Sequence, residues 1–231
     1  MRAILLAAGM GTRLRPITLN TPKSLISINN KPLIERQIEF LQAKGVEEIV
    51  IVTGYLNEKF DYLMNKYNVK LIYNDKYDKY NNIYSMFLVK EYLDDSYVID
   101  ADNFLTTNFI IEKPAKSMYF SAFKKDVENE WKIIFDETNK VIDIEIMDGK
   151  CSGYILSGVS YWSKEDAKII RKELENKITD NNSFTNYYWD DIVRENIYKL
   201  DVHINKINED DIFEIDCLMD LENVKRKFEV L

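Results

Sequence analysis

Short apolar runs alternate with helical patterns over the first hundred residues. Continuous aliphatic runs, which are typical of strands buried on both faces of a sheet, lie at 2–8, 48–53, 69–73 and 96–100. Apolar residues at three- and four-residue intervals predict helices at 33–45, 56–67 and 83–93. This alternation favours parallel βαβ units with helices on both faces of one sheet.

The spacing between predicted elements shortens after residue 115. Strand patterns lie at 118–125, 131–135, 141–147, 154–162 and 202–207, and helical patterns at 163–176, within 184–196 and from about residue 218. We therefore expect a single domain over residues 1–231 with a Rossmann-like, three-layer α/β/α fold. Its central sheet would be mixed and mainly parallel, and the later strands would form a small β-rich extension.

Three polar segments directly follow predicted strands. They are residues 9–23, 73–82 and 100–103. Ligands of open α/β sheets bind beyond the carboxyl ends of the strands. We therefore expect the three segments to meet in one crevice.

The charge distribution indicates an anion site near the N-terminus. The 231-residue chain has a net charge of −8, which argues against nucleic-acid binding, since such proteins present a basic face. Residues 1–31 nevertheless contain five basic residues and no Asp or Glu. Such a local excess of positive charge suits an anionic ligand.

Composition argues against several other classes of protein. No apolar run reaches the roughly 20 residues of a membrane span, and the first residues lack the pattern of a cleaved signal peptide. The single histidine, His203, and the two cysteines, Cys151 and Cys217, argue against a His/Cys zinc site or a Ser-His-Asp triad. The cytoplasm is the expected compartment, and the sequence leaves the oligomeric state open.

The loop after the first strand carries the most specific motif. It reads AAGMGTRLRPIT over residues 7–18, followed by TPK over 21–23. Gly9 and Gly11 let backbone N–H groups approach an anion, Arg13 offers a planar fork for phosphate oxygens, and Lys23 adds a compact charge. The loop is neither a dinucleotide fingerprint nor a Walker loop. The spacing alone also allows a tight turn with solvated basic residues.

The pattern G-x-G-T-R-x-x-P-x-T followed by P-K resembles the signature of nucleotidyltransferases that make activated sugars and alcohols. This resemblance implies that Arg13 and Lys23 hold the nucleoside triphosphate and its transition state. It also implies a nucleotide site built partly from the backbone of the loop. The residues expected there are Ala7, Ala8, Gly9, Gly11 and Thr12.

The same resemblance implies a metal site formed by two distant carboxylates. Asp102 follows a predicted strand in the segment YVIDADN, and Asp216 lies in the segment FEID. Mg²⁺ prefers few protein carboxylates, together with water and phosphate oxygens. Asp102 and Asp216 are therefore the expected Mg²⁺ ligands, with Asp100 in support. A helix cap or a solvated turn remains the alternative for each.

The whole chain resembles the small bacterial CTP:phosphocholine cytidylyltransferases. The segments that carry this resemblance are 73–85, 100–103, 129–131, 156–160, 188–190 and 214–216. It implies transfer of a cytidylyl group from CTP to phosphocholine, giving CDP-choline and pyrophosphate. Residues 1–115 would then bind the nucleotide and residues 116–231 the acceptor. The residues expected to contact the base are Asn81, Asn82, Tyr84 and Ser85; residue types alone would also permit uracil or thymine.

Aromatic residues beside acids independently suit a quaternary amine. A trimethylammonium group cannot donate hydrogen bonds, so aromatic faces and nearby carboxylates hold it best. Trp131, Tyr188, Trp189 and Asp190 are expected to form such a box, although aromatic side chains at these positions could also belong to the core. Phosphoethanolamine, aminoethylphosphonate or a sugar 1-phosphate remain alternative acceptors. The alternative of another class is a non-catalytic nucleotide-sensing domain.

Overall fold

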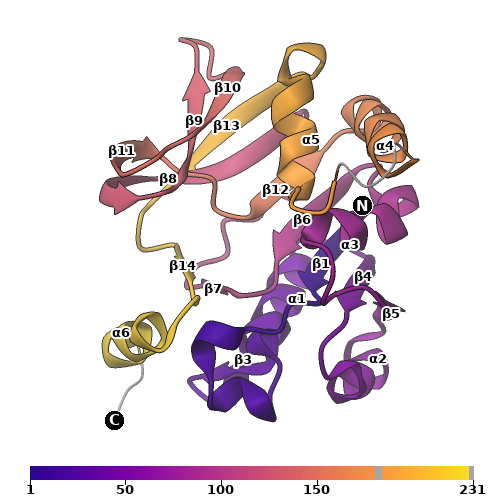
Figure 1. The fold of residues 1–231 in the computed structure, drawn as a ribbon, viewed down its shortest axis with the longest axis vertical. Coiled ribbons are helices and arrows are strands. Elements are labelled where there is room, and N and C mark those ends of the chain that lie inside the picture. The colour runs from indigo at the N-terminus through magenta and orange to yellow at the C-terminus, as the bar shows by residue number, and fades with distance from the viewer. Residues whose placement is uncertain (180–183, 229–231) are drawn as a thin grey trace.

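A computed structural model describes residues 1–179 and 184–228 of the chain (Figure 1). The strands are β1 (Arg2–Ala7), β2 (Ser27–Ile28), β3 (Lys31–Pro32), β4 (Glu48–Thr53), β5 (Lys70–Tyr73), β6 (Ser96–Asp100), β7 (Asn103–Leu105), β8 (Ser117–Glu128), β9 (Trp131–Phe135), β10 (Val141–Ile146), β11 (Lys150–Tyr154), β12 (Val159–Trp162), β13 (Val202–Ile207) and β14 (Ile212–Glu214). The α-helices are α1 (Leu33–Ala43), α2 (Asp61–Tyr67), α3 (Asn82–Val89), α4 (Lys164–Thr179), α5 (Trp189–Asn196) and α6 (Leu218–Phe228). Several 3-10 helices lie between them.

An eight-stranded mixed sheet forms the centre of the molecule. Its strand order is β11-β8-β12-β6-β1-β4-β5, with β13 paired to β8. Strands β6, β1, β4 and β5 are parallel neighbours, whereas β12 runs antiparallel to both β6 and β8. The chain moves outward from β1 to β4 and β5 and then crosses back to β6 on the other side of β1. Such a reversal of direction leaves a crevice beyond the carboxyl ends of the strands.

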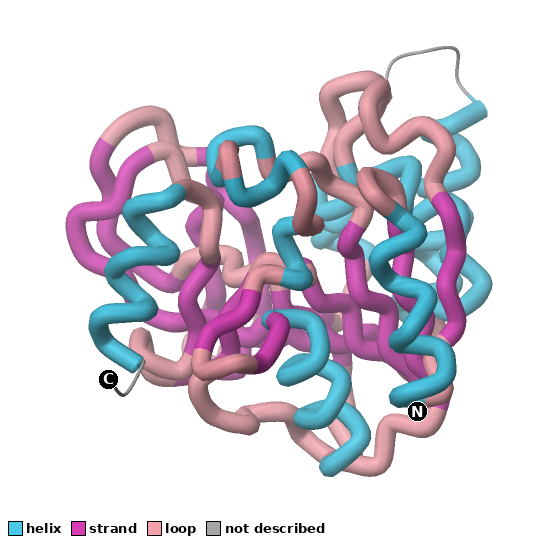
Figure 2. The backbone as a smooth tube through the Cα atoms, turned by 90° about the horizontal axis from the view of Figure 1, so that it is seen from below, coloured by secondary structure: helices cyan, strands magenta, loops and turns pink. Residues whose placement is uncertain are grey.

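Helices cover both faces of this sheet (Figure 2). In β1 the side chains of Ile4 and Leu6 pack into a cluster with residues of α3, α4 and α5. Ala3 and Leu5 point to the opposite face and pack with residues of α1 and α2. Successive side chains of a strand face opposite ways, so a continuous aliphatic run is needed where both faces are covered. The predicted three-layer α/β/α fold with a mixed sheet is confirmed.

The later strands depart from the prediction in two ways: most of β11 and all of β14 lie outside the predicted strands, and the predicted strand at 154–162 is interrupted. Residues 154–162 are not one strand, because β11 ends at Tyr154 and β12 begins at Val159. Gly158, with a φ of 71°, lies in the turn between them. A left-handed backbone of this kind cannot continue a strand. The hairpin of β9 and β10 forms the expected β-rich extension beside the main sheet.

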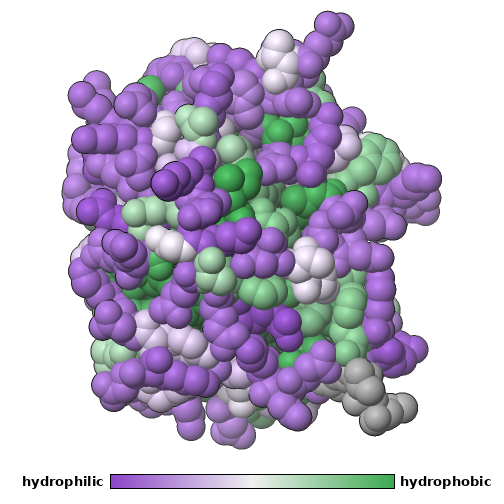
Figure 3. Space-filling model, turned by 180° about the vertical axis from the view of Figure 1, so that it is seen from behind, coloured by the Kyte–Doolittle hydropathy of each residue, from purple (hydrophilic) through white to green (hydrophobic). Residues whose placement is uncertain are grey.

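In the described part of the chain, no helix is both long and apolar enough to cross a bilayer. Figure 3 shows a face on which polar residues dominate and apolar residues appear in small separate areas. Single exposed apolar side chains of this kind are normal for globular proteins.

Candidate active site

A cavity of about 480 Å³ lies beyond the carboxyl ends of β1, β5 and β6. The loop after β1 contributes Gly9 and Lys23 to its lining, the segment after β5 contributes Asn74, and the end of β6 contributes Asp100. The prediction that the three polar segments converge on one crevice is therefore confirmed. The second half of the chain closes the cavity with residues 130–131, 156–158, 188, 190, 214 and 216.

The loop of residues 9–23 is ordered by packing against helices α1 and α6 and by contacts within the loop. Leu14 is buried and joins an apolar cluster with residues of α1 and α6. Gly11 has a left-handed backbone with a φ of 57°, and a Cβ there would come within 3.1 Å of side-chain atoms of Lys23 and Thr18. The Thr18 hydroxyl donates a hydrogen bond to the Gly11 carbonyl oxygen at 2.8 Å. This packing orders the loop that carries Arg13 and Lys23.

Lys23 lies between two carboxylates from distant parts of the chain. Its Nζ donates to Asp102 Oδ2 at 2.6 Å and to Asp216 Oδ1 at 2.5 Å. Arg13 Nη2 donates to Asp216 Oδ2 at 2.9 Å. The Lys23 side chain is 15% exposed, whereas that of Arg13 is 70% exposed, so the Arg13 guanidinium is accessible to a ligand although it is paired with Asp216.

These contacts shift the pKa values of the cluster. Burial by itself would lower the pKa of Lys23, but the Asp102 and Asp216 carboxylates outweigh burial and raise it. Burial would raise the pKa of Asp216, but Lys23 and Arg13 lower it below its ordinary value. Lys23 is therefore an ammonium group and Asp216 a carboxylate at neutral pH.

Asp102, Glu214 and Asp216 form a group that could hold a metal ion. Each offers one carboxylate oxygen, and these oxygens lie within 4.8 Å of one another. Asp102 Oδ1 is buried and has no hydrogen-bond partner in the described part of the chain. An oxygen-only donor set with an unsatisfied buried oxygen fits a hard divalent cation such as Mg²⁺.

Pairing of β7 with β14 brings these acids together. Glu214 lies opposite Asn103 in the antiparallel register, and the Ile215 N–H donates to the Asp102 carbonyl oxygen at 3.2 Å. Burial and the Asp102 and Asp216 carboxylates raise the pKa of Glu214. The sequence prediction named Asp216 but not Glu214. Residues two apart on an extended segment share a face, and this spacing was the signal that could have found Glu214.

Gly158 permits the close packing of the turn at the end of β6. A Cβ at Gly158 would lie 2.5 Å from Asp100 Oδ2 and 3.0 Å from Asn103 Nδ2. The Asn103 side chain donates to the Ser157 carbonyl oxygen at 2.9 Å. Burial, followed by the charges of Asp102, Asp190 and Glu214, raises the pKa of Asp100. Asp100 thus lines the cavity together with the metal candidates, and its supporting role stays a prediction.

Part of the expected base-contact set lines the same cavity. Asn81, Asn82 and Ser85 line the cavity together with Ala8 and Gly9. Asn74, which the sequence prediction did not include, donates to Ser85 Oγ at 2.9 Å. Part of the hydrogen-bonding capacity of the two asparagines is used within the protein, since Asn81 Nδ2 donates to the Asn186 carbonyl oxygen and Asn82 Oδ1 accepts from the Trp189 N–H.

Three of the four residues predicted to bind the acceptor, Trp131, Tyr188 and Asp190, line the cavity. The rings of Trp131 and Tyr188 meet edge to face, with centroids 6.1 Å apart. Tyr119 donates its hydroxyl to Asp190 Oδ1 at 2.9 Å. Burial raises the pKa of Asp190 to about 7. Glu130 also lines the cavity; its position next to Trp131 in the segment NEW was the available sequence signal.

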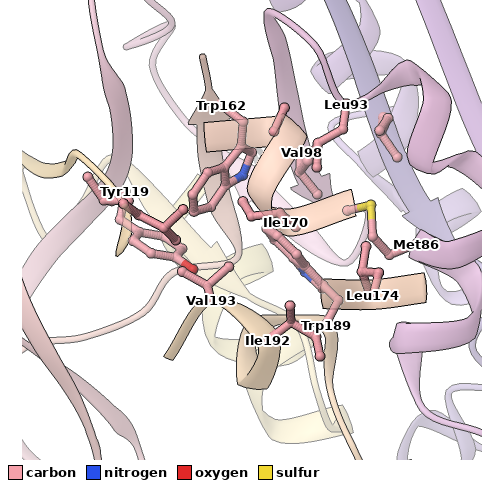
Figure 4. Packing of buried hydrophobic residues seen from close by; sticks show 14 of the residues in the cluster. Met86, Leu93, Val98, Tyr119, Trp162, Ile170, Leu174, Trp189, Ile192 and Val193 are labelled. Carbon is pink, nitrogen blue, oxygen red and sulfur yellow. The ribbon is translucent and has the colours of Figure 1, made fainter. Parts of the chain in front are cut away.

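Some predicted site residues lie outside the cavity lining. Trp189 is 2% exposed and packs edge to face on Trp162, with centroids 5.5 Å apart, inside the apolar cluster (Figure 4). Its side chain therefore belongs to the core and not to the aromatic pair. Trp189 was a predicted acceptor contact; four predicted nucleotide contacts are also absent from the lining, namely Ala7, Gly11, Thr12 and Tyr84.

Comparison with known proteins defines the class of this chain. Residues 2–203 match the protein family described as Nucleotidyl transferase. The chain therefore belongs to the nucleotidyl transferase family.

Two relatives and one solved structure are similar to this chain over nearly its whole length. The chain is 49% identical to choline-phosphate cytidylyltransferase of Streptococcus pneumoniae, with 97% of each chain covered. A solved structure of CTP:phosphocholine cytidylyltransferase from the same organism has a TM-score of 0.95 and 47% identity, and 99% of each chain is covered. The chain is also 34% identical to 2-aminoethylphosphonate cytidylyltransferase of Lancefieldella rimae, covering 95% of this chain and 89% of the relative.

Proposed function

We propose that this enzyme transfers a cytidylyl group from CTP to phosphocholine and releases pyrophosphate. The observation that carries the proposal is the pairing of two different environments in one cavity. Arg13 and Lys23 bond to carboxylates of the cavity, and Trp131 and Tyr188 form an aromatic pair in the same lining, to which Asp190 also belongs. The basic pair suits a triphosphate, and the aromatic pair with a carboxyl group in the same lining suits a quaternary amine. The names of the full-length relatives agree with both substrates.

The reaction in this proposal is an in-line displacement. A phosphate oxygen of phosphocholine forms a bond to the α-phosphorus of CTP, and the bond from that phosphorus to the bridging oxygen of pyrophosphate breaks. The attacking phosphate is already an anion, so no general base is required. Arg13 and Lys23 neutralise charge on the α-phosphate and on the leaving pyrophosphate, which makes positioning and electrostatic stabilisation the main contributions.

The family is associated with a divalent metal, and we propose Mg²⁺ at this site. Asp102 and Asp216 would hold it, with Glu214 beside them. A bound Mg²⁺ supplies positive charge that stabilises the phosphate oxygens. Lys23 belongs to the loop and donates hydrogen bonds to both aspartates. It is therefore placed to contact the phosphate oxygens that lie next to the metal.

Substrate contacts divide between the two halves of the chain in this proposal. Residues 1–115 bind the nucleotide, with the base near Ala8, Gly9 and Ser85. Residues 116–231 bind the acceptor, with the trimethylammonium group against Trp131 and Tyr188. We also propose the cytoplasm as the compartment, because Cys151 and Cys217 are free thiols, which suit reducing surroundings.

A matrix of nucleotides and acceptors tests the proposed reaction. Pyrophosphate release is measured for CTP, UTP, dTTP and ATP with phosphocholine, phosphoethanolamine, 2-aminoethylphosphonate and glucose 1-phosphate. We expect the highest kcat/KM for CTP with phosphocholine. A higher kcat/KM for any other pair would contradict the proposal. The Arg13→Ala variant should lose activity, and Arg15→Ala, an exposed arginine of the same loop outside the cavity lining, is the matched control.

One relative favours a second acceptor. The 34% identical protein from Lancefieldella rimae is named for 2-aminoethylphosphonate, whose primary ammonium group can donate hydrogen bonds. The Trp131→Ala variant separates the two acceptors, because loss of an aromatic face should weaken phosphocholine more than 2-aminoethylphosphonate. An equal loss for both would argue against a specific contact between Trp131 and the quaternary amine.

A further inference from the structure

Two asparagines at the start of α3 hold the segment that leads into α5. Asn82 Oδ1 accepts a hydrogen bond from the Trp189 N–H at 2.9 Å. Asn81 Nδ2 donates to the Asn186 carbonyl oxygen, also at 2.9 Å. The partners are 107 and 105 positions apart in the chain. Figure 1 shows the first turn of α5 beside α3, in agreement with their contacts.

The first N–H of helix α5 is accepted by a residue outside the helix. The first N–H groups of a helix have no partner within it, and a Ser, Thr, Asp or Asn at the N-cap usually accepts one of them. The N-cap of α5 is Tyr188, whose ring lies against Trp131. Its N–H donates to Asp191 Oδ2 at 2.9 Å, and the Asp191 N–H donates to the Tyr188 carbonyl oxygen at 3.2 Å. These bonds leave the N–H of Trp189, the first helical residue, which Asn82 accepts.

Asn81 is also directed away from its own helix. It occupies the N-cap of α3, where asparagine is favoured, yet its side chain makes no cap bond to α3. The side chain instead bonds to Asn186. Both asparagines therefore act on the segment 186–189, which is also anchored by the buried ring of Trp189.

We propose that Asn82, supported by Asn81, is a positioning residue for the acceptor. It fixes the first turn of α5 so that Tyr188 and Asp190 face the cavity while Trp189 stays in the core. This inference rests on the proposed function. Asn82 would then serve mainly to place the residues that receive the quaternary amine, and not to contact the base.

Steady-state kinetics of two Asn82 variants test the proposal. Asn82→Ala removes the acceptor of the Trp189 N–H, so KM for phosphocholine should rise about five- to ten-fold, the usual effect of one lost cap or neutral hydrogen bond. KM for CTP and the preference for CTP over UTP should stay within about two-fold. Asn82→Asp keeps an oxygen in the same place, and KM for phosphocholine should return to within about two-fold of wild type.

The controls distinguish positioning from general damage. Asn176→Ala removes an exposed asparagine of α4 outside the cavity and should leave both KM values unchanged. Melting temperatures are recorded for each variant, and Asn81→Ala should act in the same direction as Asn82→Ala. A rise in KM for CTP, a loss of CTP preference, an equal rise for both substrates or no change at all would each overturn the proposal. Failure of the proposed function appears separately, as absence of turnover of CTP and phosphocholine by the wild-type protein.

Discussion

Lys23 is the residue on which the charge balance of the site depends most. One ammonium group bonds to both Asp102 and Asp216. These are the same carboxylates that would hold a divalent metal. In the proposed reaction Lys23 therefore has two effects: it would stabilise the transition-state anions, and it compensates the carboxylates in the free enzyme.

Replacing Lys23 by methionine separates these two effects. Loss of the charge should lower kcat/KM by about 100-fold or more, as for removal of one preorganised electrostatic group. The uncompensated carboxylates should bind Mn²⁺ more tightly in the absence of nucleotide, which electron paramagnetic resonance of free Mn²⁺ measures. Lys59→Met, an exposed lysine outside the cavity, is the control. Near-normal turnover, or weaker Mn²⁺ binding in the Lys23 variant, would contradict this assignment.

Asp190, which we propose as part of the acceptor site, lowers the stability of the fold when it is charged. Burial raises its pKa from the ordinary 3.8 to about 7, while the hydrogen bond from Tyr119 favours the charged form and limits the shift. The folded state therefore binds the proton more tightly than the unfolded state. The stability from this group is fully present below about pH 4 and is lost as the pH rises to about 7. The charged groups near it are Asp191 and Asp100.

The Asp190→Asn variant should therefore gain stability with rising pH relative to wild type. Its free energy of unfolding should exceed that of the wild type by more at about pH 8 than at about pH 5.5, with a difference on the order of 2 kcal/mol. Phosphocholine should bind more weakly because the negative charge is lost. Urea denaturation at the two pH values measures the effect, with the exposed Glu145→Gln as control. A pH-independent difference would contradict the raised pKa.

At the scale of elements, the absence of a side chain at Gly54 lets the loop of residues 74–81 lie close to the ends of β1 and β4. A Cβ on Gly54 would lie 2.6 Å from Tyr77 Cβ and 2.7 Å from the Ala8 carbonyl oxygen. The Ala8 carbonyl oxygen is a backbone atom and Tyr77 Cβ is bonded directly to the backbone, so neither can move without a shift of the main chain. Gly54 therefore determines how closely this wall approaches the loop after β1.

Gly54→Ala should displace that wall and raise KM for CTP by about ten-fold or more, with a smaller change for phosphocholine. The matched control is Gly153→Ala, where the added Cβ would meet the far end of the flexible Lys132 side chain at 2.8 Å. Kinetics of both variants and their melting temperatures test this. If the two substitutions have equal effects on KM for CTP, the proposed role of Gly54 is wrong.

The element patterns were predictable because they depend on near neighbours in the sequence. The aliphatic runs of β1, β4 and β6 and the helical spacing of α1 were read from short segments and agree with the structure. The pairing of β7 with β14 was not predicted, since each is three residues long and its partner lies about a hundred residues away. This pairing nevertheless brings Glu214 and Asp216 to Asp102.

At the scale of the whole molecule, the main sheet joins the two halves of the chain. Strands β8, β12 and β13 come from the second half, and β12 pairs directly with β6 of the first half. A sheet shared in this way transmits loss of order from one half to the other. The two halves should therefore unfold together.

Equilibrium unfolding in urea tests this cooperativity. All three tryptophans lie after residue 115, so their fluorescence reports the second half, whereas far-UV circular dichroism reports the whole chain. The two transitions should coincide within error. A fluorescence transition with a clearly different midpoint would show that the halves are separate folding units.

The sequence by itself determined the α/β class, the glycine-containing basic loop and the strand ends at which the cavity lies. These features depend on local periodicity, on glycine at positions of special backbone geometry and on a rule that parallel sheets share. Only the tertiary structure decided which aromatic residues of the segment 188–190 face the cavity. Consecutive residues at a helix start point in different directions, and packing against Trp162 places Trp189 in the core. The asparagine bonds to α5 were likewise beyond the sequence, because distant segments make them and the fold alone brings those segments together.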